Sequence, residues 1–185
     1  RGCRLSVAAA KYIANAMVYD DVIRVADLKT RAVRFSRIRA DIGVSDDAVL
    51  HLTEYFHPRA QEVCAIFPAR WGRLVESSPT LFRWLDRLVN RGRRIRTDKL
   101  LGFIQLYMIA GLRRWRRGLL RHAVEQQHIQ SWLESVLSTA PADYDLAVEM
   151  IQCHRLVKGY SDTHTRTLSK FDRVMAAAIE LRGSV

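Results

Sequence analysis

The sequence predicts an all-α protein, built as a multi-helix bundle of about seven to nine helices. Apolar residues recur at helical spacing along almost the whole chain of 185 residues, and only 9 glycines and 4 prolines interrupt it. Hydrophobic residues make up 49% and charged residues 26% of the chain, which is typical of a globular protein with a sizeable core. We therefore expect residues 1–185 to form a single helical domain.

Two helices are expected near the N-terminus. The first presents Tyr12 and Met17 on one face, and Asp20 or Asp21 is a suitable N-cap for the second. Gly43 suits the end of the second helix, because glycine accepts the left-handed backbone conformation found there. The apolar stripe of the second helix consists of Val25, Leu28, Ala32, Phe35, Ile38 and Ile42.

Residues 49–56 form the best strand candidate in the chain. Val49, Thr53 and Tyr55 are residues that favour strands, and with His51 they would share one face. A lone strand is only marginally stable. We therefore expect this segment either to pair with something outside the chain or to lie as an extended strap.

Three prolines indicate helix starts. Pro58, Pro68 and Pro79 each suit a first helical position, where the missing N–H group costs nothing, and Ser78 is a suitable N-cap before Pro79. This predicts short helices near residues 58–66, 68–76 and 79–90. A later helix is expected to start at Pro141.

Residues 100–112 are the longest apolar run. Asp98 is a suitable cap for a helix there, and Gly118 is expected to kink or break the chain after it. Apolar residues on every side of this helix indicate a central, buried position. The run is shorter than the ~18 residues that a membrane span needs, so we expect no membrane contact.

The positive charge is concentrated in one part of the chain. The net charge is +11, and residues 91–122 supply most of it, with ten lysines and arginines opposed only by Asp98. Three interpretations remain open: a solvated basic surface, a surface for an acidic protein, and, ranked below both, a nucleic-acid interface. Trp115 is expected to anchor this segment to the core, although an exposed tryptophan would stack on bases. The interface candidates here are Arg113, Arg114, Trp115, Arg116 and Arg117.

No metal or cofactor motif is recognisable. Cys3, Cys64 and Cys153 are odd in number and form no CxxC pair, which favours free thiols in a reducing, cytoplasmic compartment. None of the six histidines has a second histidine four residues away on a helix, and no phosphate-binding or nucleophile loop occurs. We expect no metal and no cofactor in this chain.

The most polar junction between two predicted helices lies at residues 158–166. A structural turn is favoured, in which Gly159 ends one helix and Asp162 or Thr163 caps the next. The side chains are also of types that bind anions or transfer protons. The candidates are Lys158, Tyr160, Asp162, Thr163, His164 and Arg166.

A second polar segment spans residues 54–59. We expect His57 to cap the helix that Pro58 begins, and Glu54 to pair with an arginine elsewhere in the chain. The alternative places Glu54, His57 and Arg59 in an interface.

Four segments, taken in order, resemble one known family. They are residues 23–31 (IRVADLKTR), 53–59 (TEYFHPR), 111–117 (GLRRWRR) and 155–163 (RLVKGYSDT). Over residues 7–180 the chain resembles the C-terminal helical region of the beta subunit of indolepyruvate ferredoxin oxidoreductase. Members of that family usually have glycine where this chain has Ser161.

The resemblance implies a parent enzyme that oxidatively decarboxylates arylpyruvates to aryl-acyl-CoA and reduces ferredoxin. Thiamine diphosphate, magnesium and iron–sulfur clusters would belong to its large (alpha) subunit. The chain begins with Arg1 rather than Met and lacks glycine-rich βα units, so we expect a fragment of a longer subunit. Its expected partners are its own upstream catalytic domain and the large subunit.

Three functional hypotheses follow. The first is an accessory domain of this oxidoreductase, non-catalytic in isolation, which docks through the 49–56 segment and the arginine clusters. The second is a stand-alone basic all-α nucleic-acid-binding protein. The third is a small enzyme that uses the junction at residues 158–166, for which the sequence suggests no substrate.

Overall fold

The computed structural model describes residues 3–19, 21–45, 47–56, 58–159 and 162–183. These residues form ten α-helices, two 3-10 helices and a sheet of two strands, so the all-α prediction is confirmed. The chain divides into two compact units: unit 1 comprises Arg1–Asp20 and Val124–Val185, and unit 2 comprises Asp21–Ala123. That the whole chain acts as one accessory domain stays a prediction. In the described part of the chain, no helix combines the length and apolar character needed to cross a membrane.

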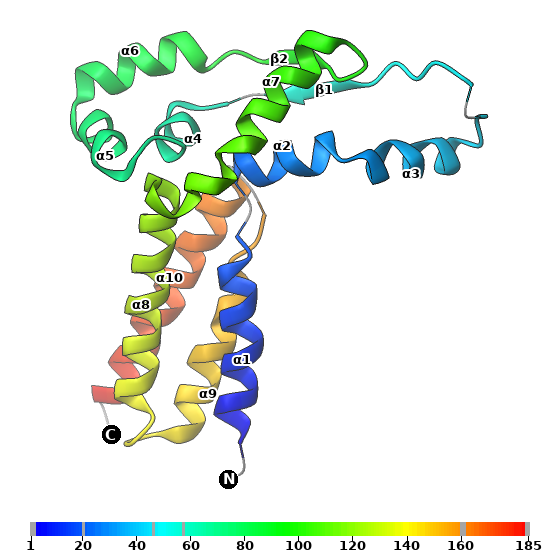
Figure 1. Ribbon diagram of the computed structural model, residues 1–185. Coiled ribbons are helices and arrows are strands. Elements are labelled where there is room, and N and C mark those ends of the chain that lie inside the picture. The colour runs from blue at the N-terminus through cyan, green and yellow to red at the C-terminus, as the bar shows by residue number, and fades with distance from the viewer. Residues whose placement is uncertain (1–2, 20, 46, 57, 160–161, 184–185) are drawn as a thin grey trace. The chain divides into compact units, whose positions relative to one another are not determined.

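Unit 1 is a bundle of helices around one core (Figure 1). Its helices are α1 (Arg4–Met17), most of α8 (Leu120–Thr139), α9 (Tyr144–Gln152) and α10 (Asp162–Gly183), with a 3-10 segment η2 (Cys153–Leu156) after α9. Each α-helix contributes buried residues to the core, among them Ala16, Ile129, Trp132, Met150, Phe171 and Met175. The unit is therefore held together by one shared apolar cluster.

Two hydrogen bonds hold α9 in place within unit 1. Asp143, rather than Pro141, is the N-cap of α9, and its carboxylate accepts the backbone N–H of Leu146 at 2.8 Å. Trp132 is 2% exposed, and its indole N–H donates to the carbonyl oxygen of Met150 at 3.1 Å. The start predicted at Pro141 was wrong because the acidic cap lies two residues further on.

Unit 2 contains six α-helices, described by these bounds: α2 (Val22–Thr30), α3 (Ala32–Ile42), α4 (Ala60–Ala65), α5 (Ala69–Ser77), α6 (Pro79–Val89) and α7 (Leu100–Gly111). A 3-10 segment η1 (Leu112–Gly118) follows α7. The helices α4, α5 and α6 pack against one another, and α2 packs against α7. Unit 2 therefore has two small cores, one around Cys64 and Leu85 and one around Ala26 and Leu106.

The single helix predicted over residues 21–43 is in fact two helices. Asp21 is the N-cap, as expected, and its carboxylate accepts the backbone N–H of Arg24 at 2.7 Å. The break falls at Arg31, whose backbone is extended with ψ 135°. Gly43 ends the second helix with φ 67°, as predicted. This division is one reason why the helices exceed the expected seven to nine.

The strand predicted over residues 49–56 forms only over residues 53–56, and its partner lies within the chain. β1 (Thr53–Phe56) pairs antiparallel with β2 (Arg93–Arg96), with Thr53 opposite Arg96 and Phe56 opposite Arg93. The prediction that this strand pairs outside the chain or lies as a free strap is therefore wrong. The sequence of β2 contains three arginines in four residues, a pattern that indicates a charged surface segment rather than a strand.

All three proline-marked helices form, with different starts. Pro79 is the first residue of α6 and follows Ser78, as predicted. Pro68 is instead the N-cap of α5, and Pro58 lies two residues before the start of α4. Proline suits each place, because these positions precede the helix interior and need no backbone N–H.

Helix α7 is open on one side, which corrects the prediction of a buried central helix. Leu106 and Ala110 are buried in the small core shared with α2, whereas Leu101 is 78% exposed. The helix also approaches β2 closely, because a Cβ at Gly102 would lie 2.1 Å from the carbonyl oxygen of Arg96. Its N-cap is Lys99 rather than the predicted Asp98. A helix that is apolar all round is buried only where neighbours surround it, and unit 2 supplies them on one face.

Candidate functional site

The polar junction of unit 1 does not gather its candidates into one site. The hydroxyl of Thr167 donates to the carbonyl oxygen of Lys158 at 2.9 Å and accepts the N–H of the same residue at 3.1 Å. Among the residues that the structure describes, Arg166 reaches only Thr163, at 3.5 Å, and both are exposed. Tyr160 and the side chain of Asp162 lie outside the described residues. The described contacts therefore fit a structural turn.

His164, the remaining candidate of this junction, faces the interior of unit 1. Its Nε2 lies 3.9 Å from the carboxylate of Glu125 on α8. The interior of unit 1 also contains the partly buried His128 and the buried His154, whose rings lie 5.7 Å apart. Phe171 packs edge-on against both rings. Nowhere in the described ranges do three or more His, Cys, Asp or Glu side chains form a group able to hold a metal.

Burial favours the neutral forms of His128 and His154. Burial, followed by the nearby charges of His128 and His164, lowers the pKa of His154 to about 4. Burial also lowers the pKa of His128. A neutral histidine packed between Trp132 and Phe171 is a component of the core rather than a group that exchanges protons at neutral pH.

Glu54, a predicted interface residue, is an internal anchor of unit 2. It is 6% exposed and accepts hydrogen bonds from Lys29 of α2 and, at 2.5 Å, from Arg34 of α3. Burial alone would raise the pKa of Glu54, but the bonds and charges of Lys29 and Arg34 outweigh it and lower the pKa. The expectation that Glu54 pairs with an arginine elsewhere is confirmed.

Arg59, the other described candidate of this segment, lies at the start of a different helix. Arg59 is the N-cap of α4, and its backbone N–H donates to the carboxylate of Glu62 at 3.3 Å. His57, the predicted cap, lies outside the described residues. Glu54 and Arg59 are therefore both engaged within unit 2, Glu54 by ion pairs and Arg59 as a helix cap.

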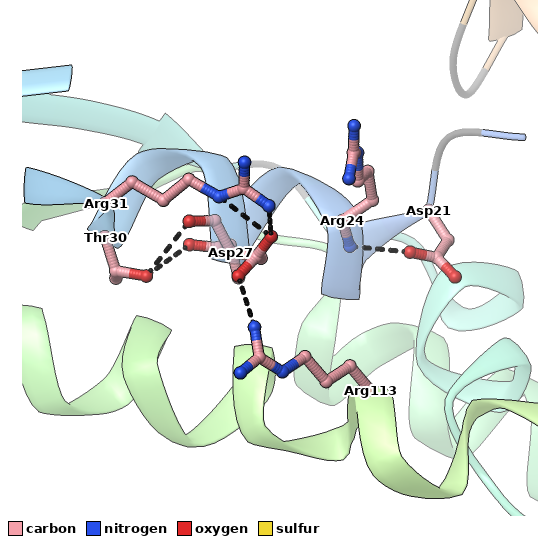
Figure 2. A network of polar contacts seen from close by, with 7 residues as sticks. Asp21, Arg24, Asp27, Thr30, Arg31 and Arg113 are labelled. Atoms are coloured by element: carbon pink, nitrogen blue, oxygen red, sulfur yellow. Dashed lines mark hydrogen bonds and ion pairs between the residues drawn. The ribbon is translucent and has the colours of Figure 1, made fainter. Parts of the chain in front are cut away.

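Two of the candidate arginines in η1 are engaged by acids of α2, and Figure 2 shows the first of them, Arg113. Arg113 donates to Asp27 at 3.2 Å, and Asp27 also binds Arg31, as the close view shows. Arg116 donates to the buried carboxylate of Asp21 at 2.9 Å. These pairs attach η1 to the first helix of unit 2, so Arg113 and Arg116 are structural.

The other three η1 candidates are exposed. Arg114 and Arg117 have no acidic partner among the described residues, and the side chain of Trp115 is 63% exposed. The prediction that Trp115 anchors the segment to the core is wrong, because Arg113 and Arg116 provide that anchor through ion pairs. This leaves Arg114, Trp115 and Arg117 available to a partner.

The exposed side of α7 is a candidate site that the sequence analysis missed. We call it the α7 face, and it consists of Leu100, Leu101, Ile104, Tyr107 and Met108. Steps of 100° per residue place these five side chains on one side of the helix, opposite Leu106 and Ala110. The available signal was the apolar run itself, which a small unit is unable to cover on all sides.

A polar hollow of about 780 Å³ lies between α3, residues 47–51 and the start of α7. Asp98, in its lining, binds Arg96 bidentately and lies 2.9 Å from Nδ1 of His51. The hydrogen bonds from Arg96 and His51 hold the pKa of Asp98 well below its usual range. The lining also includes Arg39, Asp47 and Lys99, so carboxylates and cations nearly balance and the hollow selects no ligand charge.

Comparison with known proteins places the chain in a family. Residues 1–177 match a family described as a family of unknown function, DUF6537. The chain belongs to this family. No curated protein and no solved structure matches the chain. The strongest functional features of this DUF6537 chain are therefore its own exposed surfaces, namely the α7 face and the free side chains of η1.

Proposed function

We propose that the chain is an accessory domain that assembles an arylpyruvate-oxidising ferredoxin oxidoreductase, and that it performs no chemistry alone. In this proposal it docks onto its own upstream catalytic domain and onto the large subunit. The resemblance of its four segments to the beta subunit supports this parent. By the same resemblance, thiamine diphosphate, magnesium and iron–sulfur clusters belong to the large subunit. This chain contributes the contact surface.

The α7 face is the observation that carries the proposal. Five large apolar side chains lie on one side of a single helix, and Leu101 and Met108 are 78% and 69% exposed. Soluble monomers rarely expose apolar patches of this kind unless the patch binds something. Leu101, Ile104 and Met108 repeat at the i, i+3, i+7 spacing with which a helix packs against a second element.

The arginines of η1 support the same proposal. Arg114, Trp115 and Arg117 directly follow α7 in sequence and have no acidic partner among the described residues. Tryptophan and arginine are the residues most enriched where binding energy concentrates in protein interfaces. An apolar centre beside free guanidinium groups is the usual anatomy of such an interface.

The test compares the longer subunit with wild-type sequence and with the double variant Leu101→Glu, Met108→Glu. The variant is expected to weaken binding to the large subunit by about 2 kcal/mol, roughly thirtyfold, as measured by analytical ultracentrifugation. Arylpyruvate-dependent ferredoxin reduction should fall in parallel. Val33→Glu is the matched control, because Val33 is equally exposed on α3 but has no apolar neighbours of the α7 face. Unchanged assembly and turnover in the double variant would contradict the proposal.

Nucleic-acid binding is the alternative that the exposed η1 residues favour. It predicts that the chain binds labelled duplex or single-stranded DNA with an affinity that falls steeply with salt, and that Arg114→Ala with Arg117→Ala lowers this salt dependence. The accessory-domain proposal predicts no such binding at about 0.15 M salt.

A further inference from the structure

Helices α5 and α6 carry a second set of exposed apolar residues, remote in sequence from α7. Trp71 and Leu74 on α5 are 65% and 54% exposed, and Trp84 on α6 is 65% exposed. Leu81 and Leu88, also on α6, are about half exposed. We call these five residues the hairpin face, because α5 and α6 are consecutive helices that pack against each other.

The residues of α6 fall into three rows along the helix. Steps of 100° per residue place Phe82, Leu85 and Val89 together in the row that packs in the core of unit 2. The next row around the helix is exposed and apolar: Leu81, Trp84 and Leu88. The row beyond it contains Arg83 and Arg87. The apolar surface of α6 is thus about twice as wide as the core covers, and arginines border its open half.

The same order recurs on α5. Gly72 and Val75 face the core, Trp71 and Leu74 form the exposed apolar row, and Arg70 lies beyond them. Two helices of one unit therefore repeat one arrangement of a buried row, an open apolar row and a basic border. A scattered exposed hydrophobic residue needs no explanation, but a repeated arrangement does.

The basic border has no acidic counterpart of its own. In the described part of the chain, Arg70, Arg73 and Arg87 form no ion pair, and Arg83 donates only to the carbonyl oxygen of Pro79, at 3.2 Å. Steps of 100° per residue place the acids of these helices, Asp86 and Glu76, on the side of the arginines that faces away from the apolar row, and Asp86 accepts a hydrogen bond from Asn90. The surface beside the apolar row is therefore positive.

We propose that the hairpin face binds an acidic amphipathic helix of a partner protein. Leu81, Trp84 and Leu88 span two helical turns, about 10 Å, and their i, i+3, i+7 spacing matches the apolar stripe of a facing helix. Aspartate or glutamate beside that stripe meets Arg83 and Arg87, and guanidinium groups bind carboxylates bidentately. The two tryptophans supply rigid apolar area at the centre of the contact.

The inference rests on the proposed function in one respect, since both require a protein partner. It stands on different helices from the α7 face and on a different set of arginines from those of η1. The two are therefore separable by experiment: variants of the α7 face test assembly with the large subunit, and variants of the hairpin face test the acidic helix.

The experiment titrates the full chain with synthetic peptides of about 18 residues, which form about five helical turns. The acidic probe has leucines at helical spacing and glutamates along one flank; a matched probe has lysine in place of every glutamate. Fluorescence anisotropy of the labelled peptide is expected to show binding of the acidic probe at least about tenfold tighter than the lysine probe, weakening as NaCl rises from about 0.15 M to about 0.5 M.

Variants assign the binding to the hairpin face. Trp84→Ser and the pair Arg83→Glu, Arg87→Glu are each expected to weaken the acidic probe at least tenfold, whereas Leu101→Glu with Met108→Glu on the α7 face leaves it unchanged. All the altered side chains are exposed, so circular dichroism and thermal unfolding should match the wild type. Equal binding of both probes, no loss in the hairpin variants, or binding of anionic phosphatidylserine vesicles without binding of the peptide would each overturn the proposal.

Discussion

The two units of this chain place their aromatic residues in opposite ways. Unit 1 buries its single tryptophan, Trp132, in a core shared by four helices. In unit 2, by contrast, Trp71, Trp84 and Trp115 are all more than 60% exposed, as is Tyr107 on α7. Among the described residues, every exposed tryptophan or tyrosine lies in unit 2. Unit 1 also exposes aliphatic side chains, such as Val7 and Leu137, but among the described residues the large exposed aromatic side chains, which suit a protein interface, belong to unit 2.

Unit 2 also contains carboxylates that each join two cationic side chains. Unit 2 has small apolar cores and depends on carboxylates that each bind two cationic groups, such as Glu54 with Lys29 and Arg34. Asp27 likewise binds Arg31 and Arg113. Partly buried ion pairs of this kind fix geometry more than they add stability. Unit 2 thus depends on ion pairs to fix the relative positions of its helices.

Substituting one tryptophan in each unit tests this contrast most strongly. Trp132→Ala is expected to cost about 3–5 kcal/mol of unfolding free energy, because it opens a cavity in the core and removes the indole hydrogen bond to the carbonyl of Met150, which keeps only the backbone N–H of Cys153. Trp84→Ala should change stability by no more than about 0.5 kcal/mol, because its side chain is largely in water. Urea unfolding followed by circular dichroism gives both values. Equal losses would break the contrast.

Acid should weaken unit 1 through its buried histidines. The pKa of His154 is lowered to about 4 in the folded chain, against an ordinary value near 6.5. The folded state therefore keeps the neutral form, and this contribution to stability is fully present above about pH 6.5. It is lost as the pH falls from about 6.5 to about 4, by roughly 3 kcal/mol in total.

The measurement is urea unfolding of the wild type and of His154→Phe across this pH range. The variant should show a smaller decline, whereas His51→Gln, which alters an exposed histidine of unit 2, should decline like the wild type. A decline that is the same in all three proteins would exclude His154 as its cause.

Glu54 provides the corresponding test in unit 2. Glu54→Gln is expected to cost about 2–3 kcal/mol, because Lys29 and Arg34 lose a buried anion but are themselves partly exposed and regain water. The lowered pKa of Glu54 means that its contribution is present above about pH 4.5 and lost as the pH falls through the lower folded value.

Asp145→Asn is the matched control for Glu54. Asp145 pairs with Arg4 at 3.0 Å, but both side chains are mostly exposed, so the expected cost is no more than about 0.5 kcal/mol. Chemical denaturation at neutral pH and low salt gives both values. A loss in Asp145→Asn as large as in Glu54→Gln would show that burial is not what distinguishes these pairs.

The smallest expected effect on stability concerns η1. Arg114→Ala and Arg117→Ala should leave the unfolding free energy within about 0.5 kcal/mol of the wild type, because neither guanidinium has an acidic partner among the described residues. Arg116→Ala should cost about 1–2 kcal/mol by leaving the buried Asp21 without a cation. Thermal unfolding orders the three variants, and the reverse order would contradict the assignment of Arg116 as an anchor.

Much of the fold could be predicted from local sequence, and the failures have physical causes. The caps at Asp21 and Gly43 and the start at Pro79 depend on neighbouring residues alone, so they were predictable. The break at Arg31 carries no glycine or proline. The strand β2 forms because β1 is available to pair with it, a long-range condition that three arginines in four residues do not indicate.

The candidate sites were harder to predict than the fold. Pairing of Glu54 was foreseen, because a carboxylate in an apolar segment needs a cation. The exposure of Trp115 and of the α7 face could not be predicted, because periodicity shows which side chains share a face but not whether a neighbour covers that face. The hairpin face was missed for the same reason, since Leu81, Trp84 and Leu88 continue the row of core residues.

In the proposals above, the chain binds its partner proteins through surfaces of unit 2. Hydrogen–deuterium exchange of the full chain, alone and mixed with the large subunit of the proposed oxidoreductase, measures which unit the partner covers. The account predicts that the complex slows exchange in α7 and η1, while the helices of unit 1 exchange at unchanged rates. Protection confined to unit 1, or no protection at saturating large subunit, would contradict it.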